Sequence, residues 1–134
     1  MNLLNLAIAG AVSVVATSPV KLPAAPRNVV VQGNFAYGSG GTTVDAYLQT
    51  SVDGGLTWID IAQFHFTTSA ARFVYNLNGQ TSVTAEYTAT DGSLGANTSK
   101  DGILGPQFRV KYSSTGTYAG ATNLSIDVTT DQAA

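Results

Sequence analysis

The sequence predicts an all-β fold, either a β-sandwich or a jelly roll of about seven or eight short antiparallel strands. Apolar and polar residues alternate along several short segments, as they do on a strand with one buried face. No window of a dozen residues combines helical three-and-four spacing of apolar positions with capping residues. Turn signals recur roughly every ten residues, which is the spacing of short strands in a sandwich.

The composition fits one domain and excludes several functions. The chain has 134 residues, of which only 10% are charged, and its formal net charge is −2. The basic residues are scattered and form no stripe that would neutralise phosphates, so nucleic acid is not an expected partner. Because the chain has no cysteine, disulfides, cysteine-ligated metals and thiol chemistry are excluded.

Residues 1–27 predict an extended N-terminal arm followed by a proline-containing linker, and residues 28–134 predict the β-sandwich domain. The apolar run at the start is not preceded by Lys or Arg, unlike a signal peptide. It is also shorter than the ~20 apolar residues of a membrane span, so no membrane partner is expected. The prolines between Ser18 and Arg27 favour an extended linker.

We expect this N-terminal segment to be an uncleaved arm or edge strand that packs on another surface, such as a neighbouring subunit. Its apolar side chains are the candidate interface. They are Leu3, Leu4, Leu6, Ile8, Val12 and Val14.

The next three strands follow from alternating residues and the turns between them. The first predicted strand contains Gly33 among inward-facing apolar residues, and the glycine-rich turn at 38–41 follows it. The second runs from Val44 to Gln49. In the third, Ile59 and Ile61 share a face, and the phenylalanines that follow have the opposite parity. A bulge near Ala62 would explain this change of phase.

Four further strands are expected in the second half of the chain. Residues 73–77 form a strand closed by Asn78-Gly79, and 83–87 form another. Asp91 to Pro106 has several glycines and no periodicity, which indicates a long surface loop. The strands at 108–112 and 124–128 have the clearest alternation in the chain.

The stretch Gln49 to Ile61 predicts a hairpin that closes on Asp53-Gly54-Gly55. The Asp53 carboxylate can accept hydrogen bonds from turn amides, the glycines can adopt positive φ, and Trp58 can pack over the hairpin. The residues that define this structural turn are Ser51, Asp53, Gly55, Thr57 and Trp58.

The pattern of this turn resembles the Asp-box of sialidase-type propellers. In those families the box shapes a turn away from the active site. A propeller needs several blades of about forty residues, and this chain has one box. The resemblance therefore implies a structural turn and no sialidase activity.

No catalytic, cofactor or metal site is expected, and the chain is predicted not to be an enzyme. His65 is the only histidine; it lies between two phenylalanines and is assigned to a polar surface or inter-subunit position. Asp91 and Asp101 lie in a loop without calcium-binding spacing. Asp45 and Asp60, on the two strands of the hairpin, are expected to face outward.

Several segments together resemble small β-rich proteins encoded among bacteriophage and prophage structural genes. The resemblance covers about residues 28 to 128 and is carried by Val29–Phe35, Tyr37–Thr42, Gln49–Ile61, Asp101–Gly105 and Phe108–Tyr112. It implies a virion protein, most like a capsid decoration (cement) protein on the capsid surface. Its implied partners are the major capsid protein and copies of itself, with a trimer favoured among homo-oligomers.

Two other functions remain open. One is a phage tail or fibre component. The other is a carbohydrate-binding module, because six tyrosines on a small neutral domain suit sugar stacking as well as core edges and interfaces. A flat row of two or three exposed tyrosines would favour glycan binding.

Overall fold

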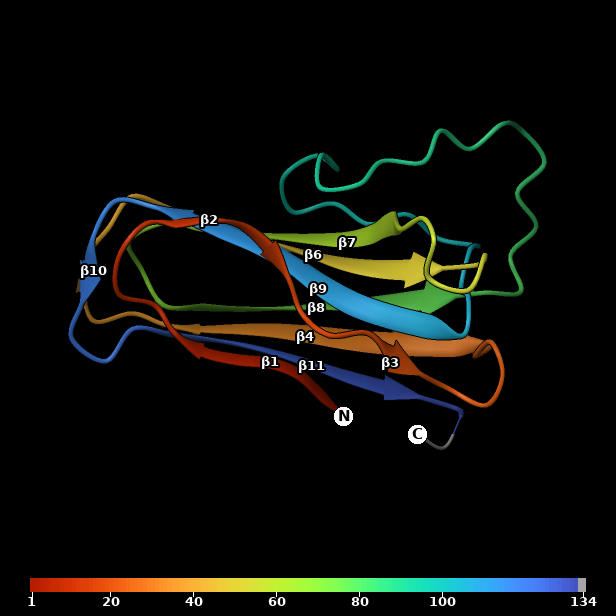
Figure 1. The fold of residues 1–134 in the computed structure, drawn as a ribbon, viewed down its shortest axis with the longest axis horizontal. Helices are drawn as coiled ribbons and strands as arrows, with labels where there is room; N and C mark the ends of the chain where they lie inside the picture. Colours follow the sequence, from red (N-terminus) through yellow and green to blue (C-terminus); the bar gives the residue numbers. More distant parts are fainter. Residues whose placement is uncertain (133–134) are drawn as a thin grey trace.

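The computed structural model describes residues 1–132, so the last two residues of the predicted domain lie outside the described part. The described residues form eleven strands and no helix. Nine of the strands lie in two antiparallel sheets that suggest a sandwich, and the other two form a separate two-stranded sheet (Figure 1). The strands are β1 (Asn2–Ala7), β2 (Val12–Ala16), β3 (Val20–Lys21), β4 (Asn28–Ala36), β5 (Ser39–Gly40), β6 (Thr43–Ser51), β7 (Ile59–Phe66), β8 (Ala71–Asn78), β9 (Gln107–Thr115), β10 (Tyr118–Ala119) and β11 (Asn123–Thr130). The all-β prediction is confirmed, but the predicted number of strands is too low.

One sheet has the order β1-β11-β4-β8, and the other has the order β2-β9-β6-β7, with β3 also pairing with β9. The two-residue strands β5 and β10 pair at one end of the molecule. The core lies between the sheets and is built mainly from the inward-facing apolar residues of β4, β6, β7, β9 and β11, with further residues from β1 and β8. The apolar residues of the alternating pattern in the sequence are the ones that line these two inner faces.

Gly33 allows the two sheets to approach each other closely. It lies in the middle of β4, and a Cβ atom at this position would be 2.6 Å from Cδ1 of Phe64 on β7. The ring of Phe64 fills the space that a side chain at Gly33 would occupy, and it also packs against Tyr75, with ring centroids 5.2 Å apart.

The predicted bulge is confirmed. In the pairing of β6 with β7, Leu48 lies opposite Ala62 and Gln49 lies opposite Asp60, which leaves Ile61 as the extra residue. Because of the bulge, Ile61 and Ala62 are both buried although they are adjacent in sequence.

The prediction of an N-terminal arm is wrong, because the N-terminus is a strand of the sandwich. β1 pairs antiparallel with β11, and β2 and β3 pair with β9, so residues 1–27 supply an edge to each sheet. Leu4 and Ile8 are buried in the chain's own core, with Leu3 and Leu6 packed against it. Val12 is half-buried, and Val14 is 62% exposed. The partner of this apolar segment is therefore largely the chain itself.

The prediction of a strand at 83–87 is also wrong, because no strand lies in residues 79–106, between the end of β8 and the start of β9. This segment forms the long excursion at the upper right of Figure 1. Part of it follows the free edge of β7, where it makes main-chain hydrogen bonds from Asp60 N to Thr90 O (2.8 Å) and from Gln63 N to Thr98 O (2.9 Å). The loop thus protects an edge that would otherwise expose unpaired backbone groups.

Candidate functional site

The hairpin turn between β6 and β7 is held by the carboxylate of Asp53. Its Oδ1 accepts hydrogen bonds from the Thr57 main-chain N–H and the Ser51 hydroxyl, both at 2.9 Å, and its Oδ2 accepts from the Thr57 hydroxyl. The Ser51 hydroxyl oxygen in turn accepts from the N–H of Gly55. Gly54 and Gly55 have φ values of 76° and 93°, which favour glycine.

These hydrogen bonds lower the pKa of Asp53 to about 2, with the Thr57 hydroxyl as the largest cause. At pH values above the ordinary aspartate pKa of about 3.9, the ionised Asp53 contributes fully to the stability of the fold. This contribution is lost as the pH falls through about 2. We expect carbon-detected NMR titration to give a pKa near 2 for Asp53. Thr57→Val should raise it toward the ordinary value, and Ser51→Ala should raise it less. An ordinary pKa in the unmodified protein would contradict this structure of the turn.

Trp58 ends the turn and packs against the outer face of the five-stranded sheet. Its side chain is 7% exposed, and the guanidinium carbon of Arg109 lies 4.5 Å from the ring centroid. Arg109 also donates from Nε to Oε1 of Gln49 at 2.7 Å. The indole is therefore connected through a stacked cation to the polar side chains of the sheet.

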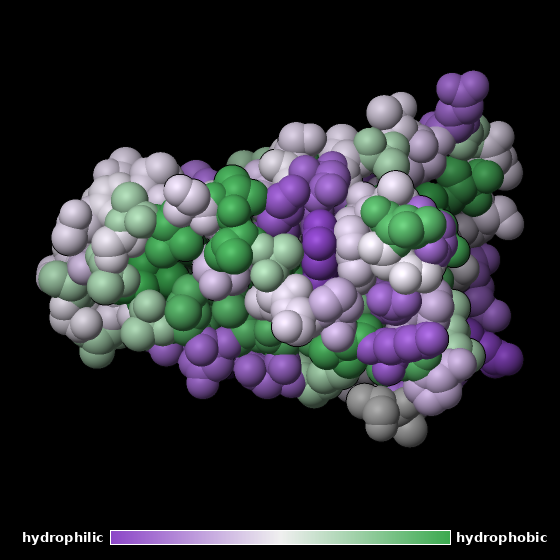
Figure 2. All heavy atoms as spheres, in the orientation of Figure 1, coloured by the Kyte–Doolittle hydropathy of each residue, from purple (hydrophilic) through white to green (hydrophobic). Residues whose placement is uncertain are grey.

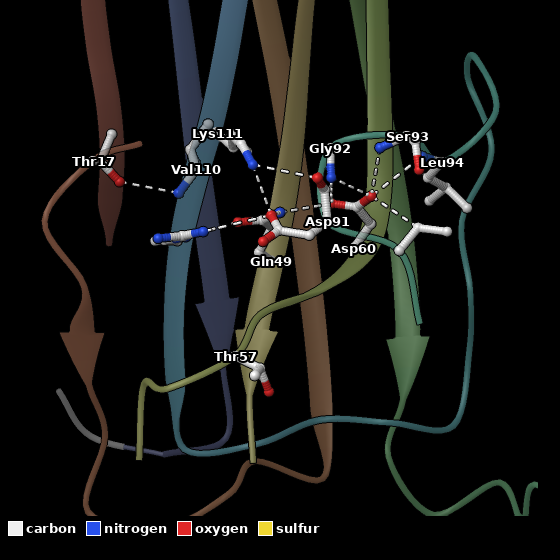
Figure 3. Close-up of polar contacts among 12 residues, drawn as sticks. Thr17, Gln49, Thr57, Asp60, Asp91, Gly92, Ser93, Leu94, Val110 and Lys111 are labelled. Atoms are coloured by element: carbon white, nitrogen blue, oxygen red, sulfur yellow. Dashed lines mark hydrogen bonds and ion pairs between the residues drawn. The ribbon is translucent and has the colours of Figure 1, made fainter. Parts of the chain in front are cut away.

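The buried carboxylate of Asp60 organises the loop that covers this face. Its oxygens accept from the main-chain N–H groups of Gly92, Ser93 and Leu94, at distances between 2.7 and 3.2 Å. Nε2 of Gln49 donates to it as well, at 2.8 Å (Figure 3). The hydroxyl of Thr90 is a further donor, at 2.9 Å. Asp60 lies on the outer face of its sheet, as expected, but it is fully buried there because the loop covers it.

Asp91 is the charged group on the solvent side of this cluster. It accepts from Lys111 Nζ at 2.9 Å and from Gln49 Nε2 at 2.6 Å. Partial burial raises its pKa, but the hydrogen bonds of Lys111 and Gln49 and the charges of Lys111 and Arg109 outweigh that effect and lower the pKa below its ordinary value. These contacts fasten the loop to β6 and β9, in addition to its bonds with Asp60 on β7.

Burial together with the charge of Asp60 raises the pKa of Tyr87 to about 12. The Tyr87 hydroxyl donates to the main-chain oxygen of Asp60 at 3.2 Å. Tyr87 is therefore a further attachment point of the loop.

A second polar group lies further along β6 and β7. Oδ1 of Asp45 is 2.6 Å from Nδ1 of His65 and accepts from Nε2 of Gln63 at 2.9 Å. Oε1 of Gln63 accepts from the N–H of Asn97, which attaches this group to the loop as well.

This group does not form a Ser-His-Asp triad. Ser113 lies opposite Asp45 on β9, whereas His65 lies opposite Asp45 on β7. The strand that carries Asp45, β6, therefore lies between Ser113 and His65, which are two strand spacings, or about 10 Å, apart. In a triad the histidine lies between the other two residues.

Among residues 1–132, no cluster of three His, Asp or Glu side chains is arranged to hold a metal ion. Within the same residues, no helix is long and apolar enough to cross a membrane. Each buried side-chain nitrogen or oxygen in this part of the chain has a hydrogen-bond partner.

The tyrosines form no exposed row within the described residues. Tyr118 is buried, and the other five are half-buried. The described residues therefore lack the flat row of exposed tyrosines that would favour glycan binding.

Sequence reasoning missed the buried polar side chains of β6 and β7, namely Gln49, Asp60 and Gln63. The sequence does carry a sign of this burial: polar residues lie at neighbouring positions of two adjacent strands, and a glycine-rich segment follows them. Such residues are buried when a loop covers them and supplies hydrogen-bond partners.

Comparisons with protein-family models, with curated proteins and with solved structures found no significant match to this chain. The fold and the polar face are therefore the basis on which a function is assigned. In this β-sandwich, the polar side chains of the outer face are largely hydrogen-bonded to one another and to the loop.

Proposed function

We propose that this chain is a non-enzymatic bacteriophage virion protein, and more narrowly a capsid decoration protein. It binds the major capsid protein at the outer capsid surface and contacts sister subunits, which stabilises the shell. A tail or fibre component is the second candidate.

The observation that carries the proposal is the set of large apolar side chains exposed on a surface with few charges. Val14 and Val15 are exposed on β2, and Val52 and Leu56 are exposed at the tip of the hairpin, where Leu56 is 84% exposed. Figure 2 shows apolar side chains gathered over the region of β2 on one face of the molecule. Contiguous exposed apolar surface is typical of a protein that docks on another.

The arrangement of the polar residues supports a binding role rather than a chemical one. Asp60 and Asp91 are engaged in fixing the loop, Asp53 in fixing the turn, and Asp45 in binding His65 and Gln63. A rigid sandwich with apolar side chains at its edge and tip offers preformed docking surfaces. Many copies of a weak contact on a closed shell then add through avidity.

Most apolar residues of β1 pack in the sandwich, so the exposed valines of β2 are the part of the N-terminal segment to test as a docking surface. We expect the double substitution of Val14 and Val15 by aspartate to weaken binding to capsids of the phage that encodes this chain by more than about tenfold, since a carboxylate would have to be desolvated. Co-sedimentation with capsids that lack the protein measures this. Val83→Asp, at an exposed loop valine, is the matched control.

Cryo-electron microscopy of the same particles separates the two candidates. Density on the capsid lattice supports decoration, whereas density confined to the tail supports the alternative. Normal capsid binding by the β2 variant would reject β2 as the docking surface, and absence of the chain from the particle would reject the virion assignment.

A further inference from the structure

Among residues 1–132, β8 is the sheet edge that has neither a register irregularity nor a covering loop. Within the described residues, β1 and β2 each carry a register irregularity, and the loop covers β7. β8 pairs with β4 without any irregularity, over eight consecutive residue pairs from Ala71 to Asn78. It contains no proline, and its one charged residue is Arg72. Long regular edges with few charges are the ones that pair with another strand.

The free hydrogen-bonding groups of β8 can be identified from one contact. In an antiparallel ladder, the N–H and C=O groups of alternate residues point to the same side. Asn78 N donates to Oδ1 of Asp101 rather than to β4. The groups of Arg72, Val74 and Asn76 therefore also point away from β4, and no hydrogen bond occupies them among residues 1–132.

We propose that β8 pairs antiparallel with β8 of a second copy, about a two-fold axis at Val74. This register uses the three free residues and no others: Val74 lies opposite Val74 of the second copy, and Arg72 lies opposite Asn76. A register centred on Tyr75 would require the groups of Asn78, whose N–H is already bonded to Asp101.

The side chains at this edge suit a second copy. The two-fold axis places no like charges opposite each other, because each Arg72 faces an asparagine. On the outer face, Val74 is 55% exposed and lies diagonally across from the exposed Val30 on β4. Two copies would thus form a continuous row of four valines. On the inner side, the partly exposed Phe73 would lie opposite Tyr75 of the second copy, which is a favourable cross-strand aromatic pair.

The pairing would join the two four-stranded sheets into one sheet of eight strands. It predicts a dimer, whereas the resemblance to decoration proteins implies a trimer. The inference does not rest on the proposed function, because it concerns the purified chain alone.

Sedimentation of the purified full chain and of two variants tests this inference. We expect a dimer for the unmodified chain and at least about tenfold weaker dimerisation for Val74→Lys, which brings two ammonium groups together at the axis. Val52→Lys, at a similarly exposed valine on the hairpin tip, should leave the dimer unchanged. A cooperative unfolding transition in both variants establishes that they are folded.

Val74→Cys tests the register, because the chain has no other cysteine. Facing residues in a hydrogen-bonded antiparallel pair have Cα atoms about 5.5 Å apart, which suits a disulfide. Oxidation should cross-link this variant and should not cross-link Val52→Cys. The proposal is overturned by a monomeric chain, by an assembly that Val74→Lys leaves intact, or by failure of Val74→Cys to cross-link.

Discussion

Replacing Asp60 with alanine is expected to destabilise the protein by about 3–5 kcal/mol, the range for removing one partner from a buried charged interaction. The carboxylate is fully buried and accepts hydrogen bonds from three consecutive loop amides, a threonine hydroxyl and the Gln49 amide. Alanine would leave these donors unpaired, and each unpaired buried donor costs roughly 1–3 kcal/mol. The loop would relieve part of this cost by detaching from β7.

Urea unfolding measures the loss of stability, and amide hydrogen exchange of Gly92, Ser93 and Leu94 measures the detachment. Asp60→Asn should be intermediate, because it keeps one carbonyl oxygen but directs an NH₂ group toward other donors. Asp127→Ala is the matched control: this strand aspartate makes a solvent-exposed contact with Asn2. Its effect should be within about 0.5 kcal/mol. Unchanged exchange at the three amides in Asp60→Ala would show that the carboxylate does not hold the loop.

The features that the sequence could predict are those with a local cause. Alternation at 108–112 and 124–128 reflects one face in the core and one outside, and these segments are β9 and β11. The change of parity at Ile61 marks the bulge, because only an inserted residue lets two adjacent residues both face inward. The hairpin at Asp53-Gly54-Gly55 follows from turn chemistry within a few residues.

The N-terminal segment was mispredicted because its partner lies at the other end of the chain. Leu6 on β1 lies opposite Leu124 on β11, and an apolar residue pattern contains no information about which strand it will pair with. The same apolar side chains suit a neighbouring subunit and the chain's own core. Here β11 offered an edge, and pairing with it buries Leu4 and Ile8.

The polar site was only partly predictable for a related reason. Parity correctly places Asp60 on the outer face of its sheet, but burial on that face depends on whether another segment covers it. The covering segment was recognised as a loop, and nothing in its aperiodic sequence specifies that its amides converge on one carboxylate. Burial of an outward-facing residue is a tertiary property, so periodicity alone cannot predict it.

Replacing Trp58 with alanine is expected to cost about 3–5 kcal/mol, the usual range for removing a buried tryptophan ring. The loss of the Arg109 contact adds to this, but a cation–π contact of this kind is worth roughly 0.5–2 kcal/mol and is the smaller effect. Without the indole, Arg109 would lose the surface on which it lies, and its bond to Gln49 would become exposed to water. The effect should therefore extend from the hairpin to the outer face of the sheet.

Chemical denaturation of Trp58→Ala and Trp58→Phe measures this, with phenylalanine expected to be intermediate because it keeps an aromatic face under Arg109. Leu56→Ala is the matched control within the same turn: its side chain is 84% exposed, so its loss should change stability by less than about 0.5 kcal/mol. If Trp58→Ala were as stable as Leu56→Ala, the hairpin would be held by Asp53 and its glycines alone. A large loss for Trp58→Ala only would mean that the turn is anchored through the indole, so the exposed tip that carries Val52 and Leu56 is presented from a rigid base.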